Sequence, residues 1–167
     1  QASLPAGTPL IALGYSMGAT AAAQAQLQGL LHADAHCMIS PMLRMHMSWL
    51  QHTSLVIFRY LLPDRLGPAH FTPLQHTSDP DEQILLASDP KWVKTMTVRL
   101  GDTMFSMAAE VLRRAKEWEH KTLLLYNAHR PREGAVDVSG TEDFFLHAAR
   151  AAIEAKKYED SCPDLLH

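Results

Sequence analysis

The fold of this chain is decided by one stretch of sequence, Pro9-Leu10-Ile11-Ala12-Leu13-Gly14-Tyr15-Ser16-Met17-Gly18-Ala19. Its first part is an apolar run bounded by proline and glycine, which predicts a buried strand over residues 9–14. The segment Ala19 to Leu31 is rich in Ala, Gln and Leu and predicts a helix. A GxSxG sequence between a strand and a helix presents its serine at a sharp, exposed turn. We therefore expect Ser16 to be a nucleophile, with the flanking Gly14 and Gly18 letting the backbones pass closely.

Further strands and helices follow outward from this stretch. Short apolar runs predict strands at Ala35 to Ile39 and Thr122 to Tyr126, and Thr141 to Lys157 reads as a long helix. Such alternation is typical of an α/β fold with a parallel sheet and flanking helices. Residues 42–118 interrupt it with five prolines and one amphipathic helix from about Thr103 to Trp118, and we interpret them as an insertion.

Composition excludes several classes of function. The chain has 167 residues, with 18 acidic and 15 basic side chains and a net charge of −3, which leaves no strong field to hold nucleic acid. Its two cysteines give neither a disulfide framework nor a zinc-ligand spacing. No apolar run approaches the ~18 residues of a membrane span. We expect no metal and no cofactor, and a cytoplasmic or peripheral-membrane location; the oligomeric state stays open.

The GYSMGA elbow resembles that of the α/β-hydrolases, in particular the branch of monoacylglycerol lipases, lysophospholipases and serine aminopeptidase-like enzymes. That branch typically carries Gly-His-Ser-Met-Gly-Gly, so Tyr15 replaces the His and Ala19 the last Gly. The segment Ile39-Ser40-Pro41 is similar to the Ser-Ala-Pro that ends the next strand in that branch, and the insertion falls where the branch places its lid.

The resemblance implies a division of the chain. Residues 1–41 would hold the nucleophile strand, elbow, helix and next strand, residues 42–118 the lid, and residues 119–167 the C-terminal core with the acid and histidine loops. The fold would then be the C-terminal part of an α/β-hydrolase, with the N-terminal strands of the domain absent. Residues 1–167 alone are accordingly expected to be inactive or poorly soluble.

The family order of Ser, acid and His points to the partners of Ser16. His167 follows a segment similar to the loop that presents the catalytic histidine, which favours it as general base over His129 and His147. The segment Glu133 to Asp137 resembles the family's acid segment. This resemblance puts Glu133 on the position of the catalytic acid, with Asp137 as the alternative. The backbone N–H of Met17 would be one oxyanion donor, and the second would come from a strand outside this sequence.

The insertion indicates the substrate. Met42, Met45 and Trp49 lie where flexible apolar side chains would suit an acyl chain, although they would equally pack a lid onto the sheet. Arg44 and Arg59 would either meet a phosphate head group or be surface charges.

These features predict a serine hydrolase that cleaves carboxylic esters of lipids, monoacylglycerol or lysophospholipid, through an acyl-enzyme. The lid is the expected place of any peripheral membrane contact. Two alternatives stay open: a catalytically inactive, hydrolase-like binding module, and a peptidase similar to the proline aminopeptidases.

Overall fold

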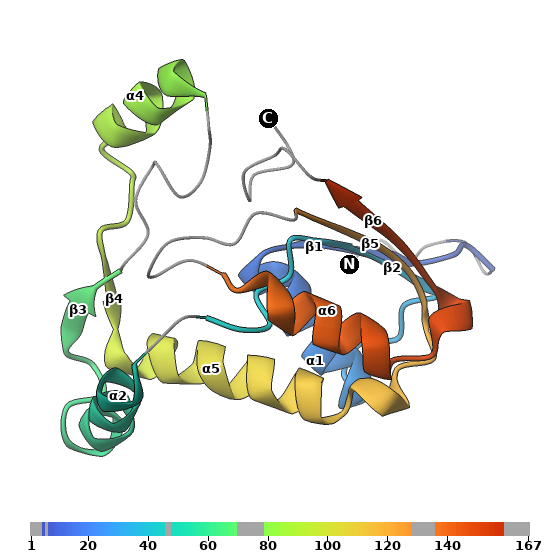
Figure 1. Cartoon of the computed structure of the whole chain (residues 1–167), viewed down its shortest axis with the longest axis horizontal. Coiled ribbons are helices and arrows are strands. Elements are labelled where there is room, and N and C mark those ends of the chain that lie inside the picture. Colours follow the sequence, from blue (N-terminus) through green and yellow to red (C-terminus); the bar gives the residue numbers. More distant parts are fainter. Residues whose placement is uncertain (1–4, 6, 46–47, 70–78, 128–135, 159–167) are drawn as a thin grey trace.

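A computed structural model describes residues 5, 7–45, 48–69, 79–127 and 136–158 (Figure 1). The elements are, in chain order, β1 (Ile11–Tyr15), α1 (Met17–Leu27), β2 (Ala35–Ile39), α2 (Trp49–Leu61), β3 (Leu66–Pro68), α4 (Pro80–Ser88), β4 (Thr95–Thr97), α5 (Val98–Arg113), the 3-10 turn η1 (Ala115–Glu117), β5 (Lys121–Asn127), α6 (Val138–His147), the 3-10 turn η2 (Arg150–Ala152) and β6 (Ile153–Tyr158).

The main sheet has the order β1-β2-β5-β6, and all of its pairings are parallel. Figure 1 shows α1, α5 and α6 together on one face of this sheet. The hydrophobic core lies between these helices and the sheet, and it includes Ala19, Met38, Val111, Trp118, Leu124 and Phe144. On the other face, Ile11 and Leu13 of β1 are 63% and 68% exposed. β3 and β4 form a separate antiparallel pair.

The first strands and helices lie where the sequence predicted them. β2 spans the predicted residues, and β1, α1 and β5 differ from prediction only at their ends. α5 begins at Val98 rather than near residue 103, because the Thr97 hydroxyl accepts a hydrogen bond from the Leu100 N–H at 3.1 Å and caps the helix there.

The predicted helix from Thr141 to Lys157 is confirmed as far as His147 and is wrong beyond it. The Asp137 side chain caps α6, which ends at His147, and the chain then enters β6. Ile153 of β6 is buried and pairs with Thr122, while Glu154 is exposed. This alternation is the period of a strand, and pairing with β5 overrides the helical preference of the Ala, Glu and Lys residues.

Two helices within residues 42–118, α2 and α4, were not predicted. Both begin at sequence signals: Ser48 and Gln51 form a reciprocal capping box for α2, and Asp79 caps α4 ahead of Pro80 in its first turn. α2 packs on α5, where the rings of His52 and Phe105 lie edge to face with their centroids 6.3 Å apart. Among the described residues, no helix has the length and apolar character needed to span a bilayer.

One histidine is part of the core. His36 of β2 is 2% exposed and lies edge to face with Trp118, with ring centroids 4.8 Å apart. Its Nε2 is 3.2 Å from Gln26 Oε1, so the neutral ring donates from Nε2. Burial, aided by the nearby His120, lowers the pKa of His36 to about 4. This histidine is therefore neutral at physiological pH and has a packing role.

Candidate active site

Ser16 occupies the turn between β1 and α1. β1 ends at Tyr15 and α1 begins at Met17, so the strand, turn and helix that the motif requires are all present. Ser16 has φ 50° and ψ −119°, a conformation that costs an L-residue of order 1–3 kcal/mol. Such a residue persists only where its surroundings fix it, and strain of this kind is often found at active sites.

Backbone hydrogen bonds hold Ser16 from the β2 side. Its N–H donates to Ile39 O at 2.9 Å, and its carbonyl accepts from the Met42 N–H at 3.2 Å. The Ser16 side chain makes no capping bond to α1, although it stands at the position where serine usually caps a helix. The Ser16 hydroxyl is therefore not used to cap α1.

The two glycines of the motif have different roles. A Cβ at Gly14 would lie 2.5 Å from Ala19 Cα and 2.7 Å from Ala19 N, so only glycine fits where α1 crosses β1. A Cβ at Gly18 would meet nothing within 4 Å. The expectation of a close backbone approach is therefore right for Gly14 and wrong for Gly18.

The N–H of Met17 belongs to the first residue of α1. The first N–H groups of a helix have no partner inside the helix, and the helix dipole places partial positive charge there. This N–H directly follows Ser16 in the chain, and Met17 is 40% exposed.

The predicted partners of Ser16 differ in what the structure describes of them. Glu133, His129 and His167 lie outside the described residues. The carboxylate of Asp137 accepts a hydrogen bond from the Ser139 N–H at 2.9 Å and caps α6. His147 ends α6 with an exposed ring whose Nδ1 lies 2.8 Å from Asp143 O.

A small apolar cavity of about 190 Å³ lies between residues 42–45 and α5. Its wall includes Met42 and Met45 from one side and Met104, Phe105 and Leu112 from α5. Trp49, the third predicted substrate contact, does not line this cavity and is 78% exposed on α2. The structure thus brings together two of the three residues.

Arg44 and Arg59, the two arginines considered for binding a phosphate group, each form an ion pair with an aspartate. Arg44 donates to Asp143 Oδ2 at 2.7 Å and to Ser139 Oγ at 2.8 Å. These bonds tie the segment after β2 to α6. Arg59 of α2 pairs with Asp102 of α5 at 2.8 Å. The described residues contain no group of three or more His, Cys, Asp or Glu side chains placed to hold a metal ion.

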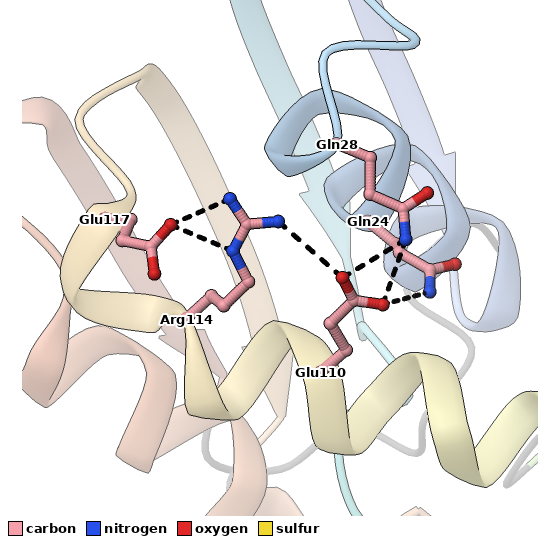
Figure 2. Close-up of polar contacts among 5 residues, drawn as sticks. All are labelled: Gln24, Gln28, Glu110, Arg114 and Glu117. Atoms are coloured by element: carbon pink, nitrogen blue, oxygen red, sulfur yellow. Dashed lines mark hydrogen bonds and ion pairs between the residues drawn. The ribbon is translucent and has the colours of Figure 1, made fainter.

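A polar network fastens α1 to α5 (Figure 2). Glu110 accepts hydrogen bonds from Gln24 at 2.6 Å and from Gln28 at 3.0 Å, and it lies 3.6 Å from Arg114, which also pairs with Glu117 at 2.8 Å. The hydrogen bonds from the two glutamines, reinforced by Arg114, lower the pKa of the Glu110 carboxyl. Sequence reasoning missed this network, because Gln24 and Gln28 lie 86 and 82 residues from Glu110.

Solved structures of lipases and esterases share this fold. A monoacylglycerol lipase from Paleococcus ferrophilus matches with a TM-score of 0.85 at 13% identity, over 96% of this chain and 62% of its own. A soluble variant of monoglyceride lipase from Saccharomyces cerevisiae, in complex with a substrate analog, matches with a TM-score of 0.77 at 18% identity, over 93% and 54%. A carboxyl esterase from Bacillus coagulans gives 0.66 at 14% identity, over 93% and 58%.

The chain therefore spans between 54% and 62% of the length of these structures. The likeness shows an α/β-hydrolase fold, with a parallel sheet flanked by helices. A comparison with curated proteins gives no match. Residues 2–167 match the model of the family described as serine aminopeptidase, S33, and the chain belongs to this family of α/β-hydrolases.

Proposed function

We propose that this chain carries the nucleophile and lid of a serine hydrolase that cleaves carboxylic esters of lipids, with monoacylglycerol preferred to lysophospholipid. One observation carries the proposal. The Ser16 hydroxyl does not cap α1, and the Ser16 carbonyl accepts a hydrogen bond from the N–H of Met42, a residue that lines an apolar cavity. Met42 thus links the Ser16 backbone to a cavity whose apolar lining would suit an acyl chain. The structures of similar fold include two monoacylglycerol lipases, in line with this substrate class.

The reaction would follow the serine-hydrolase scheme. Ser16 Oγ attacks the ester carbonyl while His167 takes its proton, and the Met17 N–H donates to the oxyanion. His167 then protonates the leaving alcohol, which leaves the acyl group on Ser16. Water, activated by the same histidine, releases the fatty acid. The triad needs no metal or organic cofactor for these steps.

For the acid we propose Glu133 rather than Asp137, because the Asp137 carboxylate caps α6. Asparagine caps a helix as well as aspartate, so Asp137→Asn should keep both fold and activity. Glu133→Gln should lower kcat by roughly 10³–10⁴, since an amide cannot stabilise the imidazolium. Ester hydrolysis by the two variants of the full-length protein checks this. A large loss in Asp137→Asn with an active Glu133→Gln would reverse the assignment.

The preference for a neutral head group follows from the arginines. Arg44 and Arg59 are each paired with a carboxylate, so neither offers an unpaired cation to a phosphate. The lid also exposes apolar side chains, among them Trp49, Tyr60 and Leu61 of α2, which are 78%, 75% and 67% exposed. Exposed apolar side chains of this kind suit contact with a lipid surface.

A substrate comparison tests this proposal. Full-length protein is offered monooleoylglycerol and oleoyl-lysophosphatidylcholine in the same neutral vesicles, with prolyl-p-nitroanilide as a peptidase substrate. We expect kcat/KM for the monoacylglycerol to exceed that for the lysophospholipid by about tenfold or more, which is ~1.4 kcal/mol of transition-state binding. Faster cleavage of the anilide would favour the aminopeptidase activity in the family's description.

A further inference from the structure

We propose that Thr20 is a positioning residue for the nucleophile, holding Ser16 in register with the start of the lid through the backbone of Met42. The inference rests on the proposed function, because it requires Ser16 to be the nucleophile. It assigns a catalytic consequence to a side chain that touches neither substrate nor the reacting atoms.

The Thr20 hydroxyl lies one turn after Ser16 on α1 and is completely buried. Threonine in a helix ordinarily donates to the carbonyl four residues earlier. Here the distance to that carbonyl, Ser16 O, is 3.5 Å, whereas Met42 O lies at 2.8 Å. The hydroxyl hydrogen is therefore directed across to the segment that leads from β2 into the lid.

Met42 is held to the first turn of α1 by both of its backbone groups. Its N–H donates to Ser16 O at 3.2 Å, and its carbonyl accepts from Thr20 Oγ1. The Thr20 N–H also reaches Ser16 O at 3.3 Å. Ser16, Thr20 and Met42 thus form a closed ring of hydrogen bonds, and the Thr20 hydroxyl is the side-chain group in it.

This ring of hydrogen bonds matters because the backbone is strained both at the end of β1 and at the end of β2. Ser16 has φ 50° and Ser40 has φ 43°, and the Ser16 N–H bonds to Ile39 O, directly before Ser40. Residues in this region keep their conformation only when neighbouring groups determine it. Without the Thr20 hydroxyl, the buried Met42 carbonyl loses a donor and the segment gains freedom to move away from Ser16.

A displaced segment would affect rate more than binding. Met42 also lines the apolar cavity, so one hydroxyl sets the position of Ser16 relative to the acyl-chain wall. Misplacement of a reacting group by about 1 Å lowers rates up to ~10²-fold. A short soluble ester, which needs little of the cavity, should show this loss in kcat with KM little changed.

The test uses three variants of the full-length protein. Thr20→Val removes the hydroxyl at nearly constant shape, and Thr20→Ser keeps it. Thr122→Val is the control for the loss of a buried threonine hydroxyl: Thr122 is 5% exposed, and its hydroxyl donates to His120 O at 2.8 Å and accepts from Trp118 Nε1 at 2.9 Å. Thr122 pairs with His36 at the opposite end of β2 from Ile39, so it lies away from the elbow.

We expect Thr20→Val to lower kcat for p-nitrophenyl butyrate by about 10- to 100-fold. The rate of fluorophosphonate labelling should fall in parallel, with an unchanged pH midpoint. Thr20→Ser should restore most of both rates. Thr122→Val should lower the Tm at least as far while keeping kcat within about threefold.

Ser16→Ala in the same assay separates this inference from the proposed function. If Ser16→Ala is labelled like the wild type, the proposed function fails and the role of Thr20 falls with it. If Ser16→Ala is unlabelled but Thr20→Val is as active as Thr122→Val, the proposed function stands and the positioning role is wrong. Equal losses in Thr20→Ser and Thr20→Val would also overturn it.

Discussion

Ser16→Ala should abolish ester hydrolysis, lowering kcat by about 10⁴–10⁶-fold in the full-length protein. The reason is chemical: no other oxygen can take the place of Ser16 Oγ at the strained tip between β1 and α1 and form the acyl-enzyme. A residual rate above that of water is expected, because oxyanion donors and binding contribute without the nucleophile. The measurement is the initial rate of p-nitrophenyl butyrate hydrolysis.

Ser106→Ala is the control for this variant, since Ser106 is an exposed serine on α5. It should keep the wild-type rate. Wild-type activity in Ser16→Ala would exclude the proposed mechanism. An inactive wild type that is nevertheless folded would instead favour the hydrolase-like binding module.

Gly14→Ala should remove activity by a different route. Its new Cβ would lie 2.5 Å from Ala19 Cα, and both atoms are fixed, one to β1 and one to the backbone of α1. Relief requires α1 to move away from β1, which takes Ser16 and the Met17 N–H with it. We expect a loss of stability of about 1–3 kcal/mol or more, and a fall of at least about 10²-fold in fluorophosphonate labelling.

Gly18→Ala offers a matched comparison within the same motif. A Cβ there would meet nothing within 4 Å, and alanine favours the helix by about 1 kcal/mol. Urea unfolding and labelling of the two variants side by side decide the matter. Equal damage from both substitutions would contradict the crossing of α1 over Gly14.

Local signals in the sequence were enough to predict the elbow and most of the sheet. The apolar run before Gly14 and the Ala-rich segment after Gly18 specify a strand and a helix within about 20 residues, so no distant partner is needed. β6 could not be recognised in the same way. Its Ile-Glu-Ala-Lys-Lys-Tyr sequence is compatible with a helix, and pairing with β5, some 30 residues earlier, makes it a strand.

The sequence predicts the chemistry that we propose for the site, but not the contacts that support Ser16. The proposed nucleophile, Ser16, and the proposed oxyanion donor beside it follow from a motif whose geometry is local. The role of Thr20 depends on Met42, which returns to α1 only after β2 is placed in the sheet. The helix-capping role of Asp137 likewise shows only when α6 is seen to begin there, although Asp137 followed by Ser139 is a sequence compatible with a cap.

The most direct test of the central claim is to locate a fluorophosphonate adduct on the full-length protein by tandem mass spectrometry of its peptides. The adduct should lie on Ser16, in the segment that joins β1 to α1, and prior incubation with monooleoylglycerol should slow its formation. An adduct on any other serine would contradict Ser16 as the nucleophile, as would a folded protein that forms none.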